Sequence, residues 1–294
     1  MSFYRSVKIA KKRPASAFGP STLFLPCIST SRSSLYECDY NLHKSNSSYF
    51  SNFDIARLNL IVQAVGKGID ITRNELLKEN PKDKSWFNIP LGGVAINFRR
   101  EIKPLEKFEI WTRVLAWDRK WLYIVGHFVK PGTCKPKRYL LQPWKNVRVV
   151  ERASGEEKNE PVIYACAIAK YCFKKNRLTI PPERVLRAAS VLPPKPAGID
   201  SISANTTPNG RGGDTDAVSS IPAVEKAAEV LSSSNAGDVL LSALEPKVVA
   251  DDEWYWQHVE DERLRGLKIA EMYNGLDQLQ DEFRSEEGTV LSTL

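Results

Sequence analysis

The segment 47–65 constrains the fold of this chain more than any other. Its large apolar residues recur at steps of three and four, the spacing that places side chains on one face of a helix; they are Tyr49, Phe50, Phe53, Ala56, Leu60, Ile61 and Ala64. A helix rises about 1.5 Å per residue, so this one would be roughly 28 Å long and would cross a whole small sheet. Gly66 and Gly68, which follow, are typical of a helix end. We therefore expect one long helix with a single buried face.

Strand-like runs lie on both sides of this helix, one before it at 29–37 and four after it at 87–99, 107–117, 121–130 and 161–174. The run 107–117 alternates as expected for a sheet whose two faces are used differently. The segment 117–121 predicts a tight hairpin. The last run is apolar on both sides, which favours a sheet packed on the helix on one face and on another sheet or subunit on the other. The pattern predicts an α+β domain in which antiparallel strands wrap one helix.

The composition changes along the chain and divides it into four parts. We predict a basic flexible arm at 1–21, a folded domain at 22–190, a low-complexity linker at 191–251 and an acidic tail with an amphipathic helix at 252–294. This tail helix can dock on the domain or on a partner, and the sequence leaves both open. The segment 131–160 is long and basic, which favours disorder or strand extension; a lid over the site is the functional alternative.

Charge and cysteine usage exclude several classes of protein. The five cysteines contain no C-x-x-C pair, which indicates a reducing compartment, and no apolar run approaches the roughly 20 residues needed to span a bilayer. We expect a cytoplasmic protein, with mitochondrial import as the alternative, because the arm before Glu37 is basic and free of acidic residues. The net charge of +7 suits nucleic acid or the phosphates of coenzyme A, but the sequence contains no nucleic-acid motif, so we expect no nucleic-acid partner. His43, His127 and His258 lack the spacing of zinc ligands, and we expect neither a metal nor a cofactor.

A polar turn just before the long helix carries the candidate catalytic residues. Asp39, His43 and Asn46 fall close together where the N–H groups of a new helix are free to bind a developing negative charge. The backbone donors would come from Ser47, Ser48 and Tyr49, at the positive end of the helix dipole. A carboxylate, an imidazole and such donors are groups that acyl transfer uses. The turn is therefore a plausible site of acyl transfer.

Each of these residues also has a structural interpretation. Asp39 can accept backbone hydrogen bonds in a turn, His43 can fix that turn, and Asn46 can cap the helix. In the catalytic interpretation, the imidazole of His43 either hydrogen-bonds the substrate carbonyl or positions the attacking water. Cys38 is a rival nucleophile, but strand alternation would turn it away from a cleft that Asp39 faces.

The pattern D-x-x-x-H-x-x-N of Asp39, His43 and Asn46, with Tyr49 and the sequence DIAR after it, resembles the thioesterase-like hotdog superfamily. This group includes the 4-hydroxybenzoyl-CoA and acyl-carrier-protein thioesterases. The residues 92–129 resemble the middle strands of that family, and IPPERVL, at 180–186, resembles the segment that closes the domain. The likeness covers roughly 22–187. This chain has Glu37 where the family often has Asp, and Ser45 in place of the first Asn of a frequent Asn-Asn pair.

The resemblance implies a hotdog fold, in which a five-stranded antiparallel sheet wraps one helix, and a homodimer with an acyl tunnel at its interface. It implies that the carboxylate of Asp39 acts as nucleophile or general base on an acyl-CoA or acyl-carrier-protein thioester. Glu37, Arg99 and Arg100 are then expected to contact the substrate, the arginines at a phosphate of the carrier arm. Similar chains occur in fungal natural-product clusters, which favours a fatty or polyketide-type acyl chain. The alternatives are a non-catalytic acyl-binding or scaffold protein and a hotdog dehydratase.

Overall fold

A five-stranded sheet and the helix that it wraps make up the centre of the structure. The computed structural model describes residues 19–83, 85–134, 136, 139–140, 161–194 and 256–280. In chain order the elements are η2 (Pro20–Thr22), β1 (Cys27–Arg32), η3 (Leu35–Glu37), α2 (Asn46–Ala64), α3 (Gly66–Glu79), β2 (Phe87–Asn88), β3 (Leu91–Phe98), β4 (Lys107–Trp117), β5 (Leu122–Val129), β6 (Ile163–Tyr171), β7 (Phe173–Lys175), β8 (Leu178–Ile180), α4 (Pro182–Ala188), α7 (Trp256–Asn274) and η5 (Gly275–Gln280).

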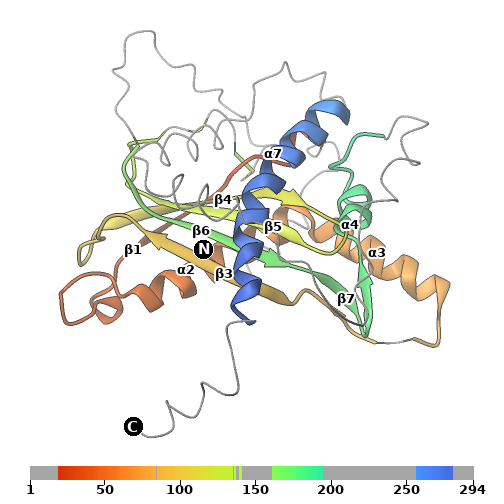
Figure 1. The fold of residues 1–294 in the computed structure, drawn as a ribbon, viewed down its shortest axis with the longest axis horizontal. Coiled ribbons are helices and arrows are strands. Elements are labelled where there is room, and N and C mark those ends of the chain that lie inside the picture. Colours follow the sequence, from red (N-terminus) through yellow and green to blue (C-terminus); the bar gives the residue numbers. More distant parts are fainter. Residues whose placement is uncertain are drawn as a thin grey trace, which may run out of the picture.

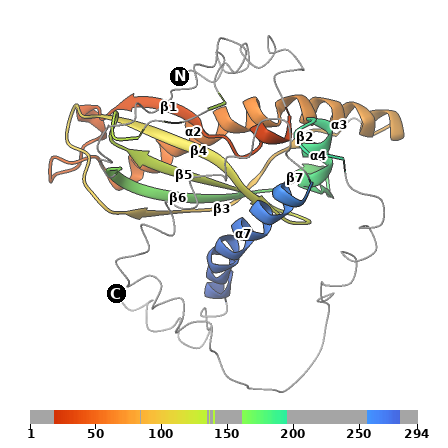
Figure 2. The ribbon, with the colours of Figure 1, turned by 90° about the horizontal axis from the view of Figure 1, so that it is seen from above.

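All strand pairs of the main sheet are antiparallel, in the order β1-β4-β5-β6-β3. A smaller sheet has the order β2-β7-β8. Helix α2 lies along one face of the main sheet, as Figures 1 and 2 show. This arrangement confirms the predicted class of a helix wrapped by antiparallel strands.

Helix α2 packs against the main sheet through its apolar face. The predicted residues of that face are buried, except Phe50, which is half-buried. Phe53 is fully buried and lies against Gly126 of β5, where a Cβ atom would come within 2.3 Å of its ring. The Thr112 hydroxyl of β4 lies 3.4 Å from the carbonyl oxygen of Ala56 and donates to it. The helix and the centre of the sheet are therefore in direct contact.

The first strand differs from the prediction, whereas the long helix ends at Ala64, close to the predicted end, and is followed directly by a second helix. The run expected at 29–37 is strand only to Arg32, because Ser34 then accepts a hydrogen bond from the Tyr36 N–H and starts the turn η3. The glycines at 66 and 68 do not end the helical region, since α3 begins at once. A Cβ atom on Gly68 would lie 2.2 Å from the Val185 carbonyl oxygen, so this glycine lets α3 pack closely on α4.

Two predicted strands are each divided. The run 87–99 is interrupted at Pro90, which has no N–H to give to a ladder but accepts a bond of 3.1 Å from the Cys172 N–H. The run 161–174 is interrupted at Cys172 itself. The pieces beyond these breaks pair as β2 and β7 in the smaller sheet.

Helix α7 covers the outer face of the main sheet. Figure 2 shows α2 on one side of the sheet and α7 on the other. Gly266 allows close approach, since a Cβ atom there would lie 2.2 Å from the Leu115 carbonyl oxygen. Lys170 of β6 is buried and forms an ion pair of 2.6 Å with Asp277. The tail helix thus docks on the domain. At Ile168 and Lys170 of β6 this helix covers the sheet, so the expectation of another sheet or subunit there was wrong.

Three predicted segments lie wholly or largely outside the described residues: the arm at 1–21, the possible lid within 131–160 and the linker at 191–251. Within the part of the chain that the structure describes, no helix combines the length and the apolarity needed to cross a membrane.

The contact between Phe53 and Gly126 predicts the effect of adding one methyl group. We expect Gly126→Ala to lower the free energy of unfolding by about 1–3 kcal/mol, because the Cβ atom collides with a fully buried ring. Gly66→Ala is the matched control, since the nearest atom to its Cβ is Val62 Cγ1 at 4.0 Å. Urea unfolding of both variants tests this, and equal stabilities would contradict it.

His127 of β5 predicts a loss of stability in mild acid. Burial lowers the pKa of His127 from 6.5 to about 3, with the charge of Arg113 as a second cause. Below pH 6.5 the unfolded chain binds a proton that the folded chain refuses, so stability falls toward pH 3, by at most about 1.4 kcal/mol per pH unit. We expect His127→Gln to show a shallower decline than the parent in urea unfolding between about pH 7 and pH 5. Parallel declines would exclude His127 as the cause.

Candidate active site

The loop between η3 and α2 is closed by backbone hydrogen bonds. The Asp39 N–H donates to the His43 carbonyl oxygen at 2.9 Å, and the Ser45 N–H donates to that of Glu37 at 2.7 Å. Leu42 completes the reversal with a φ of 58°. These bonds hold Asp39 and His43 at the two ends of one tight turn.

Asp39 has both a structural contact and a place in a pocket. Its Oδ1 accepts from the Asn41 N–H at 2.9 Å and from the His43 N–H at 3.4 Å, the pattern of an Asx turn. These bonds use one oxygen of the carboxylate. Asp39 also lines a pocket of about 580 Å³, in which a carboxylate oxygen can meet water or substrate. The two interpretations of Asp39 are therefore compatible.

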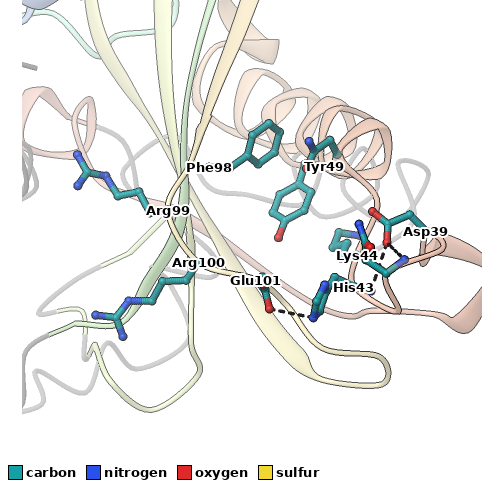
Figure 3. A pocket seen from close by; sticks show the side chains of 10 residues that line it. Asp39, His43, Lys44, Tyr49, Phe98, Arg99, Arg100 and Glu101 are labelled. Atoms are coloured by element: carbon teal, nitrogen blue, oxygen red, sulfur yellow. Dashed lines mark hydrogen bonds and ion pairs between the residues drawn. The ribbon is translucent and has the colours of Figure 1, made fainter.

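His43 and Glu101 both line the pocket, and Figure 3 shows their side chains in contact. Its Nε2 is 2.8 Å from Oε2 of Glu101, which follows strand β3. The sequence did not single out Glu101, because in the charged run RREIK it is typical of a solvated residue. Its distance from His43 along the chain leaves no local signal that pairs them.

Lys44 is a buried cation at the same loop. Its Nζ lies 2.5 Å from Oε2 of Glu37 and 5.0 Å from the centroid of the Phe108 ring. Oε1 of Glu37 lies 3.5 Å from Nδ2 of Asn52. Glu37, which was expected to contact substrate, is thus engaged with Lys44 and Asn52 and is not among the residues that line the pocket.

The start of α2 is shifted by one residue from the expected cap. Ser45 is the N-cap and Asn46 the first helical residue, which lines the pocket. The Ser48 N–H donates to the Ser45 carbonyl oxygen at 3.0 Å. Of the N–H groups at this end, those of Asn46 and Ser47 have no acceptor within the helix geometry. These two groups are suited to an anion, whereas the expected donor Ser48 already gives its N–H to Ser45.

Two aromatic rings form the apolar wall of the pocket. The rings of Tyr49 and Phe98 meet edge to face with centroids 5.1 Å apart. Burial raises the pKa of Tyr49 to about 12, so its hydroxyl stays protonated at neutral pH. The side chains of Arg99 and Arg100 leave the same rim but point away from Asp39 in Figure 3. The pocket therefore has an apolar wall, a polar loop and a cationic edge.

Cys38 takes no part in this pocket. Its Sγ donates to the Ser34 carbonyl oxygen at 3.3 Å, and it is not among the lining residues. The argument from strand alternation was wrong, since Cys38 follows a turn and makes only an isolated bridge to Lys44. The conclusion that Cys38 faces elsewhere agrees with these contacts.

Several known proteins similar to this chain are named as thioesterases. The thioesterase-like superfamily matches residues 34–164. Thioesterase poxG of Penicillium oxalicum is 33% identical over 268 residues, which cover 90% of this chain and 72% of that one. Thioesterase lcsJ of Purpureocillium lilacinum is 28% identical over 263 residues, covering 83% and 65%. Among solved structures, a 1,4-dihydroxy-2-naphthoyl-CoA thioesterase from Synechocystis is 8% identical with a TM-score of 0.37, covering 56% of this chain and 95% of that one. The chain belongs to the thioesterase-like superfamily and is a thioester hydrolase.

Proposed function

We propose that this hydrolase cleaves the thioester of an acyl-CoA or an acyl-carrier protein in the pocket between the start of α2 and the end of β3. The observation that carries the proposal is the placement of Asp39, with Oδ1 fixed by two backbone N–H groups, in a pocket that also includes the helix start. Family membership favours hydrolysis over the scaffold and dehydratase alternatives.

In the proposed reaction, Asp39 acts as general base toward a water molecule. The water oxygen bonds to the carbonyl carbon while one of its protons moves to the Asp39 carboxylate. The N–H groups of Asn46 and Ser47 stabilise the oxyanion at the positive end of the helix. The carbon–sulfur bond then breaks, and the proton passes to the departing thiolate.

The pocket walls support a fatty or polyketide-type acyl chain with a charged carrier arm. Tyr49 and Phe98 supply the apolar surface for the chain. Arg99 and Arg100 are exposed at the rim, where they can meet phosphate groups outside the pocket.

A homodimer through β3 fits the same proposal. This strand lies at the end of the sheet order, so its outer ladder groups are available to a second copy. Phe98 at its end is 38% exposed and lies on the pocket wall, so such pairing would bring the partner close to the acyl chain.

Asp39→Asn tests the general base. The amide oxygen can still accept the backbone bonds of the turn, but the group no longer takes a proton, so we expect kcat to fall about 10²- to 10⁴-fold. The assay follows free thiol from acyl-CoAs of varied chain length. Asp118→Asn is the matched control, because Asp118 Oδ1 accepts backbone N–H bonds in the remote hairpin in the same way. Equal hydrolysis by Asp39→Asn and the parent would remove Asp39 from the mechanism.

The rim arginines predict a difference between substrates. We expect the double variant Arg99→Gln, Arg100→Gln to raise KM for an acyl-CoA severalfold and to leave kcat nearly unchanged, because the contact lies away from the reacting carbon. The same acyl group on N-acetylcysteamine, which has no phosphate, serves as the control substrate. Equal changes in KM for both substrates would show that the arginines do not bind phosphate.

A further inference from the structure

We propose that Glu101 is a positioning residue of this active site: its carboxylate accepts a hydrogen bond from the Nε2–H of His43 and so fixes the imidazole with Nδ1 as the hydrogen-bond acceptor for the attacking water. This inference rests on the proposed hydrolysis in the same pocket. It adds a residue that lies outside the turn motif and is contributed by the far side of the pocket.

The pair is held by the backbone on both sides. The Lys44 N–H, next to His43, donates to the carbonyl oxygen of Ile102, next to Glu101, at 3.0 Å. His43 is also bonded through its own N–H and carbonyl oxygen to Asp39. The distance of 2.8 Å between Nε2 and Oε2 therefore joins two segments that are already tied together.

The chemistry of the two groups determines which nitrogen carries the proton. An ionised carboxylate only accepts hydrogen bonds, and a neutral imidazole has a single N–H. In the neutral imidazole, with Nε2 donating to Glu101, Nδ1 has only a lone pair to offer. Of the two roles that the sequence left open for His43, donation to the substrate carbonyl and positioning of water, the pair selects the second.

The water then has a defined place in the reaction. One of its hydrogens bonds to Nδ1 of His43, and the other faces the Asp39 carboxylate that takes it. The oxygen lone pair is left to form the bond to the thioester carbon as the carbon–sulfur bond breaks. The proton held by Asp39 passes to the leaving sulfur, so the products are a carboxylic acid and a free thiol.

The exposure of the His43–Glu101 pair indicates that the pair contributes little to the stability of the fold. The side chains of His43 and Glu101 are 36% and 66% exposed, and exposed pairs of this kind contribute little to stability. Loss of the Glu101 carboxylate should therefore leave the unfolding temperature unchanged. A fall in activity would then reflect the orientation of His43 rather than the fold.

The test compares Glu101→Ala, Glu101→Asp and the parent in two measurements. The first is kcat and KM on one acyl-CoA, where we expect Glu101→Ala to lower kcat about tenfold to a hundredfold with little change in KM, and Glu101→Asp to recover part of it. The second is the ¹⁵N shifts of the ring nitrogens, which report the tautomer. The chain has 3 histidines, so the His43 signal is identified by its loss in His43→Gln. We expect the Nε2–H form in the parent and a mixture in Glu101→Ala.

The matched control is Glu79→Gln, which removes an exposed partner of Arg184 at 2.7 Å far from the pocket. It should leave kcat and the His43 signal unchanged. Parental kcat in Glu101→Ala, or an unaltered His43 tautomer, would overturn the proposal. The two proposals can fail separately. Undiminished hydrolysis by Asp39→Asn would exclude Asp39 as the base of the proposed function. The tautomer measurement tests the role of Glu101 whether or not a substrate is cleaved.

Discussion

The burial of α2 against the main sheet is the interaction on which the rest of the structure depends. The ring of Phe53 lies where a side chain at Gly126 would be. One turn earlier, the rings of Tyr49 and Phe128 pack with their centroids 4.9 Å apart. These contacts set the position of the helix along the strands. The start of α2 is therefore placed beside the end of β3, where Phe98 meets the ring of Tyr49. The pocket exists because two elements far apart in sequence are brought to the same edge by one apolar contact surface.

The sequence predicted the long helix, the strands and the hairpin because their signals are local and periodic. The apolar face of α2, the alternation in β4 and the hairpin at 117–121 each follow from residues close together in the chain. The turn with Asp39 and His43 was found for the same reason. Glu101 and Lys44 were missed because their roles come from contacts across the fold. A lysine in a polar turn is typical of a solvated residue, and its burial depends on Phe108 and Glu37 lying around it.

The cover on the outer face of the sheet was also predicted only in part, because it too depends on contacts between distant segments. The apolar residues on both sides of β6 correctly indicated that both faces are covered, but not by what. Helix α7 supplies the cover through a small residue, Gly266, and through polar contacts at its end: Lys170 pairs with Asp277, and Asn274 donates to the Tyr123 hydroxyl at 2.8 Å. The amphipathic pattern of α7 does not say what its apolar face covers; its contacts with Leu115 and Lys170 show that it covers this domain.

The two departures from the family pattern both lie in the support of the loop, and the first, Glu37, is explained by the buried cation Lys44. Glu37 stands where the family often has Asp, and its longer side chain reaches both Lys44 and Asn52 of α2. A buried ammonium group needs such a partner, because an unpaired charge in an apolar environment is strongly destabilising. At the other departure, the Ser45 carbonyl oxygen accepts from the N–H and the hydroxyl of Ser48, so the first turn is closed without an Asn at that position. Both changes therefore affect the support of the loop. They leave Asp39, His43 and Asn46, the first residue of α2, in the lining of the same pocket.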